Sequence, residues 1–227
     1  MIRKGVGKII NVGITTNNSL DHSKVILSSN GKMRINGSGF KIDVPAKQKV
    51  VIINNGDRLW VSVDGKHRVK TVNPLDITAY GYYITLEGLK KGHTTTPRYR
   101  GDMLIKPSKT NSKKIRVINK VKIEDYLKQV VPSEMPESFG VEALKAQAVA
   151  ARTYALSDYL KNRYEKDGFH VKDTTESQVY NNAKENESST KAIEATSGKV
   201  LMNDGKPIDA KYFSTSSGFT EAANYIW

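Results

Sequence analysis

Short apolar runs separated by turn residues make up roughly the first 120 positions of the chain. The turn sequences Asn55-Gly56-Asp57 and Asp64-Gly65 separate such runs and are typical of β-hairpins. Apolar and polar residues alternate over 59–63, as in a half-buried strand. This part is therefore predicted to be antiparallel β, as a small open barrel or a sandwich. We expect strands at residues 8–15, 24–27, 40–44, 49–53, 58–63, 82–86, 103–106 and 114–121.

Helical periodicity begins only at Lys122. Residues 123–131 place four apolar side chains on one face and are predicted to form a short helix that ends before Pro132. Residues 140–164 carry apolar residues at steps of three and four, which predicts a helix of about six turns with Ser138 as its N-cap. Many of these apolar residues are alanines, so we expect another segment of backbone to approach that face closely.

A third helix is expected at 184–198, with Gly198 as its C-cap. Strands are expected to follow it at 200–202 and 208–213. The resulting fold class is α+β, in which an N-terminal, mostly antiparallel β region precedes a mixed region of helices and strands. We place the boundary between a basic β-rich region, 1–98, and a second region, 99–227.

Two prolines flank a glutamate in the sequence Pro132-Ser133-Glu134-Met135-Pro136. Because proline fixes its own φ and disfavours helix in the residue before it, these residues are predicted to form a stiff, extended bracket. The neighbouring side chains of Val130, Val131 and Met135 are apolar, and apolar surroundings raise a carboxyl pKa, as a proton donor near neutral pH requires. The alternative is an ordinary glutamate in a surface loop.

Positive charge is concentrated in the first half of the chain. Residues 1–116 hold 22 Lys/Arg and 7 Asp/Glu, a net charge of +15, whereas residues 117–227 hold 14 and 16, a net charge of −2. Such a field favours a polyanionic partner, and general solubility is the alternative explanation. No helix-turn-helix, zinc-finger or RNA-recognition motif occurs, so we expect no nucleic-acid partner.

Cysteine is absent, which excludes disulfides, thiolate metal sites and cysteine nucleophiles. The four histidines stand singly without metal-ligand spacing, so no metal is expected. No run approaches the roughly 20 apolar residues of a membrane span. The basic N-terminus is followed by polar residues, so we read no export signal in this chain.

Several sequence blocks together resemble one family. Residues 123–127 (IEDYL) precede the Pro-Ser-Glu-Met-Pro block, and residues 142–154 (EALKAQAVAARTY) follow it. The chain is similar to the SpoIID/LytB domain family, whose members are peptidoglycan lytic transglycosylases or proteins that stimulate wall amidases, and the similarity covers residues 99–227. Further blocks that carry the resemblance are Asp173-Thr174-Thr175, Gln178-Val179-Tyr180, residues 195–201 and residues 212–221.

The resemblance implies that Glu134 is the catalytic acid of a lytic transglycosylase. Such an enzyme cuts the glycan strand after N-acetylmuramic acid, and the C6 hydroxyl of that sugar closes onto C1 to leave a 1,6-anhydro end. One carboxyl group can then serve as acid and base, and no cofactor is implied. Glu124 and Asp125 are competing carboxylates nearby, and Asp173 is an auxiliary candidate.

The remaining candidates are expected to contact the glycan. Arg152 has a structural alternative, pairing with a carboxylate, and Tyr180 is as readily explained by core packing. Gln178 and Tyr180 are expected on one side of a strand. Ser217 replaces a glycine common in the family, within a hydroxyl-rich segment expected to surround the glycan. The full set of expected substrate contacts is Ser133, Gln147, Arg152, Asp173, Gln178, Tyr180, Ser214, Ser216 and Thr220.

Peptidoglycan glycan strands and anionic wall polymers are therefore the expected partners, in an extracytoplasmic location. Membrane attachment would require a segment absent from this chain. The family sequence continues beyond the position of Trp227, so the catalytic region is expected to be truncated at its C-terminus. The alternative function is a non-enzymatic wall-binding activator of an N-acetylmuramoyl-L-alanine amidase, and a nucleic-acid-binding module is the second alternative.

Overall fold

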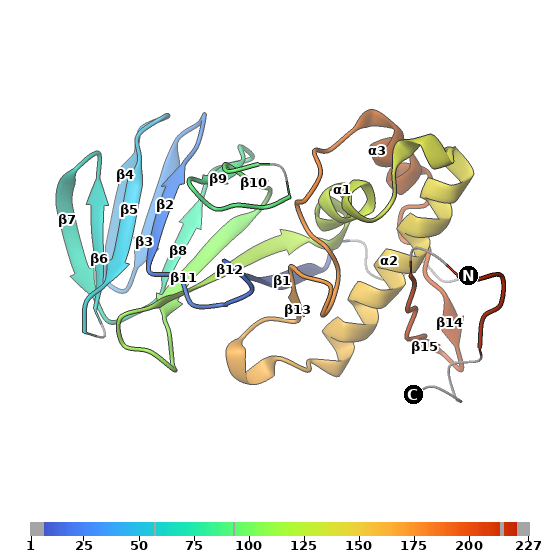
Figure 1. Ribbon diagram of the computed structural model, residues 1–227. Helices are drawn as coiled ribbons and strands as arrows, with labels where there is room; N and C mark the ends of the chain where they lie inside the picture. The colour runs from blue at the N-terminus through green and yellow to red at the C-terminus, as the bar shows by residue number, and fades with distance from the viewer. Residues whose placement is uncertain (1–6, 57, 93, 214–215, 222–227) are drawn as a thin grey trace.

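The computed structural model of the chain describes residues 7–56, 58–92, 94–213 and 216–221 (Figure 1). The strands that precede the first helix are β1 Ile9–Ile14, β2 Lys24–Ser28, β3 Met33–Gly37, β4 Phe40–Val44, β5 Val50–Asn54, β6 Leu59–Val63, β7 Lys66–Thr71, β8 Leu75–Thr78, β9 Ile84–Leu86, β10 Arg98–Tyr99, β11 Asp102–Pro107 and β12 Ile115–Lys122. The elements that follow are α1 Ile123–Glu134, η1 Glu137–Phe139, α2 Val141–Lys161, η2 Glu165–Asp167, β13 Val171–Lys172, α3 Glu187–Ala195, β14 Met202–Asn203 and β15 Lys206–Pro207.

Two large sheets form the first part of the molecule. One has the strand order β13-β1-β12-β11-β8-β3-β4 and the other β10-β9-β2-β5-β6-β7. All pairs are antiparallel except β1 with β13. Apolar residues from one face of each sheet join a single core, as in a sandwich. The three α-helices gather at the end of the molecule opposite to β6 and β7 (Figure 1).

The fold class α+β is confirmed, but the sequence pattern missed the strands β3, β7 and β8 and the two-residue strands β10, β13 and β15. In β3 and β8 polar residues alternate with buried ones, and β8 has only four residues. In β7 four of the six residues are Lys, Arg or His, because this strand lies at the edge of its sheet and buries little. The prediction of a strand at 208–213 was wrong, since the strands found near these residues are β14 and β15, which form a short hairpin.

Helix α1 corrects the expectation of an extended bracket. The helix continues through Pro132 and ends at Glu134, with Met135 as its extended C-cap. The hydroxyl of Ser133 donates to the carbonyl of Gln129 at 2.6 Å, and the buried Val130 and Val131 hold the helix against the core. These contacts outweigh the local preference against helix before proline. Glu134 is therefore held by the last turn of a helix, not by an extended segment.

The other two helices are close to the expected ranges, although their caps differ. Gly140, with φ of 89°, is the N-cap of α2 in place of Ser138. Thr196 is the C-cap of α3, two residues before Gly198. Small residues of α2 are buried as expected, including Ala148, Ala151 and Ala155. None of the helices in the described ranges has the length and apolar character of a membrane span.

Candidate active site

Glu134 lies at the carboxyl end of α1, where the chain turns into η1 and α2. Its Oε1 accepts a hydrogen bond from the backbone N–H of Val179 at 2.7 Å. Burial raises the pKa of Glu134 above its ordinary value, although hydrogen bonds from Val179 and from the Tyr212 hydroxyl oppose this shift. The negative end of the α1 dipole also disfavours a carboxylate there. The carboxyl group is thus held in position and has a pKa above that of an ordinary glutamate.

Tyr212, the first residue of the block 212–221, lies beside Glu134, although the sequence alone gave it no expected role. Its hydroxyl accepts a hydrogen bond from Nε2 of Gln178 at 3.0 Å, so its own proton is free to point at Glu134. Burial and the nearby Glu134 carboxylate raise the pKa of Tyr212. The ring of Tyr154 lies edge-on to Tyr212, with 6.5 Å between centroids. Only the tertiary contacts distinguish Tyr212 from the other ten tyrosines.

Gln178 connects α1, α2 and the segment that carries Tyr212. Its Oε1 accepts from the Tyr126 hydroxyl at 3.2 Å, and its Nε2 donates to the Ala151 carbonyl at 3.2 Å as well as to Tyr212. The side chain is almost fully buried. Gln178 therefore orients Tyr212 from behind, and Tyr212 lies between it and Glu134.

Ser133 fixes the segment that passes Glu134. Its Oγ accepts hydrogen bonds from the backbone N–H groups of Asn182 at 3.0 Å and Ala183 at 3.1 Å while donating to Gln129. Together with the bond from Val179 to Glu134, this ties residues 179–183 to the last turn of α1. The hydroxyl is thus engaged in positioning the site wall.

Gln147 is buried on α2, and no described residue is a hydrogen-bond partner of its Nε2. An unpaired buried amide costs free energy unless something else satisfies it. Gln147 lies one turn before Ala151, whose carbonyl binds Gln178. Among the expected substrate contacts, Gln147 therefore offers an N–H group that no described residue binds.

Two expected substrate contacts, Arg152 and Tyr180, lie in the interior instead. Arg152 is fully buried and pairs with Glu124, so the structural alternative for it is the one found. Tyr180 is also fully buried; its ring packs on Tyr126 and its hydroxyl donates to Asn119 at 2.8 Å. Residues 178–180 have no strand structure, so the expected alternation of Gln178 and Tyr180 was wrong.

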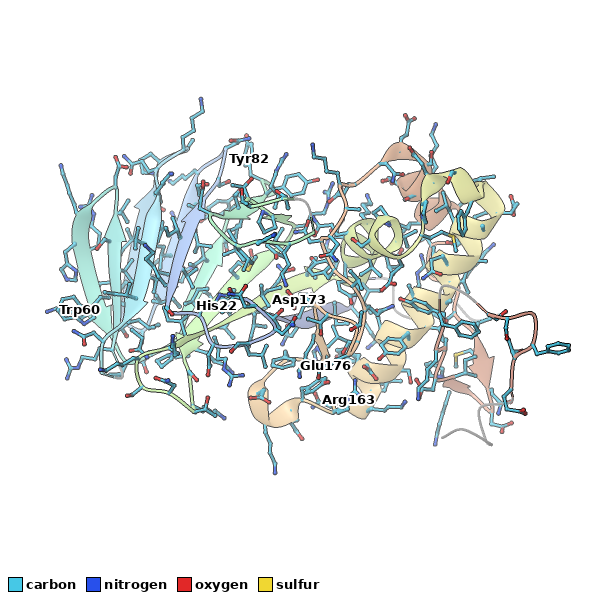
Figure 2. All side chains as sticks on the ribbon, viewed as in Figure 1. His22, Trp60, Tyr82, Arg163, Asp173 and Glu176 are labelled. Carbon is cyan, nitrogen blue, oxygen red and sulfur yellow. The ribbon has the colours of Figure 1, made fainter. Side chains whose placement is uncertain are left out.

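Asp173 belongs to a separate buried cluster near His22 (Figure 2). It pairs with Lys91 at 2.5 Å and accepts from the hydroxyl of Thr15 at 2.7 Å and from its backbone N–H. The carboxylate is completely buried and fully engaged, so it is not placed as a second acid for Glu134. Ser216 and Thr220 are exposed, whereas Ser214 lies outside the described residues.

The comparisons with known proteins agree on one family. The family model SpoIID, described as stage II sporulation protein, matches residues 111–203. An amidase enhancer from Bacillus subtilis (strain 168) is 48% identical over 101 residues, 44% of this chain and 13% of the relative. Stage II sporulation protein D from the same strain is 35% identical over 161 residues, and that from Bacillus amyloliquefaciens is 35% identical over 158 residues.

These matches cover only part of this chain and only part of each relative. The two sporulation proteins are matched over 63% and 62% of this chain, which spans 47% and 46% of their length. No solved structure matches the chain.

Proposed function

We propose, from the premise that this chain belongs to the SpoIID/LytB family, that it is a lytic transglycosylase of peptidoglycan with Glu134 as its acid and base. The family and the names of the relatives support a role at the cell wall. The observation that supports lytic transglycosylase activity is the position of Glu134: it is partly buried, held by the Val179 N–H, and has a raised pKa beside Tyr212. An extracytoplasmic location follows from the same proposal.

Glu134 suits a reaction in which one carboxyl group acts twice. In its protonated form it donates a proton to the glycosidic oxygen that leaves C1 of N-acetylmuramic acid. The resulting carboxylate then removes the proton of the C6 hydroxyl, whose oxygen bonds to C1 and forms the 1,6-anhydro ring. Glu134 ends the cycle protonated, and no water is consumed.

Neighbouring groups support each half of that cycle. Burial favours the protonated form that begins the cycle, whereas Val179 N–H and the Tyr212 hydroxyl stabilise the carboxylate formed midway. Gln178 holds Tyr212 in place. The Nε2 of Gln147, which has no partner within the described ranges, is proposed as a donor to the glycan. Ser216 and Thr220, both exposed, stay proposed substrate contacts on the segment that follows Tyr212.

Glu134→Gln tests the proposal because it keeps the side-chain shape and removes the transferable proton. With peptide-free glycan strands as substrate, product formation is expected to fall about 100-fold to 10,000-fold. Mass analysis of the products identifies the reaction, since a hydrolase product is about 18 Da heavier than the anhydro product. Glu137→Gln, an exposed glutamate in η1, is the matched control and should retain activity. Full activity of Glu134→Gln would exclude Glu134 as the acid.

The second candidate is an activator of a wall amidase, and the 48% identity to an amidase enhancer favours it. An added N-acetylmuramoyl-L-alanine amidase separates the two functions. An activator accelerates release of stem peptides by the amidase and forms no anhydro ends, with either wild-type protein or Glu134→Gln. Anhydro ends that depend on Glu134, with no effect on the amidase, support the transglycosylase.

A further inference from the structure

The outer face of the six-stranded sheet carries apolar side chains although no described element covers it. In β2, β5 and β6 one set of residues faces the core, and the other set points outward. The outward set includes Ile26, Val51, Ile53 and Trp60, where a solvated sheet face ordinarily carries polar residues. Ile53 is 37% exposed, and the other three are half-buried.

Cations flank this apolar strip in register. Lys24 pairs with Ile53, Ile53 pairs with Trp60, and Trp60 pairs with Lys70, so one row crosses β2, β5, β6 and β7. Lys24 and Lys70 are exposed at its two ends. We call this row, Lys24–Ile53–Trp60–Lys70, the Trp60 row. An apolar centre with a lysine at each end thus lies on the outer face of the sheet.

Lys70 and the indole of Trp60 are in direct cation–π contact. The ammonium of Lys70 lies 3.7 Å from the ring centroid of Trp60, and His67 lies beside the same ring at 6.0 Å between centroids. Figure 2 shows Trp60 at the end of the molecule farthest from the helices, and Glu134 lies on one of these, α1. The row is therefore separate from the proposed active site.

Protection of the sheet edge explains only part of this arrangement. Charged residues on an edge strand prevent pairing with other chains, and Lys66 and Arg68 of β7 fit that role. The same argument gives no reason for outward apolar residues on β2, β5 and β6, which are inside the sheet. Trp60 and Lys24 therefore need another explanation.

A polar cleft of about 560 Å³ adjoins the Lys24 end of the row. Its hydroxyl, amide and cationic groups match the hydroxyl, amide and carboxylate groups of an amino sugar polymer, and the Asp21 carboxylate that also lines it is paired with Arg116. The row and the cleft together provide stacking, hydrogen bonding and positive charge along one surface. The cleft is lined by Thr16, Asn17, Ser19, His22, Lys24 and Lys114, among others.

From this combination we propose that the Trp60 row is a second binding surface for peptidoglycan glycan strands, separate from the site that cuts them. The proposal rests on the proposed function for the identity of the polymer. Pyranose rings and N-acetyl methyl groups pack on Ile53 and on the exposed part of the Trp60 ring that Lys70 does not cover. Carboxylates of the strand, on the lactyl groups or on the stem peptides where these are attached, pair with Lys24 and Lys70. The +15 of residues 1–116 attracts the same anionic polymer.

A phosphodiester polymer of the wall fits this surface less well. It would satisfy the two lysines but, without a ring in its backbone, would leave the indole and Ile53 unpaired. The row combines an aromatic group with cations, which favours a carboxylated polymer of sugar rings.

Sedimentation with peptidoglycan freed of phosphodiester polymers tests the proposal. All variants carry Glu134→Gln, so that the polymer stays intact. At about 0.1 M salt, Trp60→Ala and the pair Lys24→Glu with Lys70→Glu are each expected to raise Kd roughly tenfold, equivalent to about 1.4 kcal/mol. Near 1 M salt, where the Debye length is about 3 Å, the effect of the lysine pair should shrink and that of Trp60→Ala should persist.

The matched control is Lys41→Glu with Lys199→Glu, which changes the net charge equally on exposed residues elsewhere. It should raise Kd less than about twofold. Three outcomes would each overturn the proposal. They are equal losses of affinity in the two lysine pairs, unchanged affinity of Trp60→Ala, and wild-type binding only to walls that keep phosphodiester polymers. Thermal midpoints identify folded variants, and the exposed lysine pair tests the row even if Trp60→Ala is unstable.

Activity separates this proposal from the proposed function. With Glu134 intact, Trp60→Ala should cleave short soluble glycans at the wild-type rate, and a lower rate would place Trp60 in the catalytic machinery and overturn a separate surface. If the wild type cuts no glycan, the proposed function fails, while binding that depends on Trp60, Lys24 and Lys70 still supports the row.

Discussion

Arg152→Met should strongly destabilise the helical end of the molecule. The guanidinium is fully buried on α2 and binds both carboxylate oxygens of Glu124 on α1, at 2.8 and 2.9 Å. It also donates to the carbonyls of Ala148, Ile193 and Lys199. One side chain therefore connects α1, α2, α3 and the segment after α3.

The expected magnitude follows from what the substitution leaves behind. Methionine fills much of the volume, but Glu124, with 22% of its side chain exposed, loses its cation, and the buried carbonyls lose a donor. Breaking one side of a buried ion pair costs about 3–5 kcal/mol. For a protein of this size, that lowers the thermal midpoint by roughly 6–20 °C.

Chemical denaturation of Arg152→Met measures the free energy of unfolding. Lys145→Met is the matched control, because it removes a pair between the partly exposed Lys145 and the exposed Glu142 on the same helix and should cost less than about 0.5 kcal/mol. Adding Glu124→Gln to Arg152→Met should recover part of the loss, since the uncompensated charge disappears. A loss below about 1 kcal/mol in Arg152→Met would refute the reasoning and return Arg152 to the candidate substrate contacts.

Two further predictions concern α2 and the titration of Glu134. Ala151→Leu should overpack the buried face of α2 and lower the free energy of unfolding by about 1–3 kcal/mol, whereas the exposed Ala146→Leu should change it little; equal thermal midpoints would contradict the close packing. Because burial raises the pKa of Glu134, the folded protein keeps this proton where the unfolded chain has lost it. The wild type should therefore lose stability relative to Glu134→Gln as the pH rises from the ordinary glutamate pKa through the raised one, and parallel stability curves between about pH 4 and pH 8 would contradict the shift.

The family and the identity of the central carboxylate were accessible from sequence, because both depend on local blocks. The family recognition is confirmed by the model match over 111–203 and by the relatives. The role of Glu134 stays a proposal. Its local structure was predicted wrongly, since the two prolines indicate an extended segment, whereas burial of Val130 and Val131 and the bond from Ser133 to Gln129 keep it helical.

Side-chain roles were less accessible, because residue type does not reveal burial. Arg152 and Asp173 have groups that bind glycans well, yet both are buried in ion pairs: Arg152 pairs with the partly exposed Glu124, and Asp173 pairs with the buried Lys91. Tyr212 was one aromatic residue in a conspicuous block, and its relation to Glu134 depends on a chain reversal some 80 positions later.

What the sequence by itself determined is therefore the α+β class, the uneven charge, the alanine-rich helix and the motif around Glu134, since each follows from composition or from spacing within one element. Tertiary structure alone decided which polar side chains contact Glu134 and which are buried with partners in the interior. It also brought Lys24, Ile53, Trp60 and Lys70 into one row, because strand register joins residues 46 positions apart. Local patterns specify elements, but pairing and burial between distant segments specify the surfaces that bind and react.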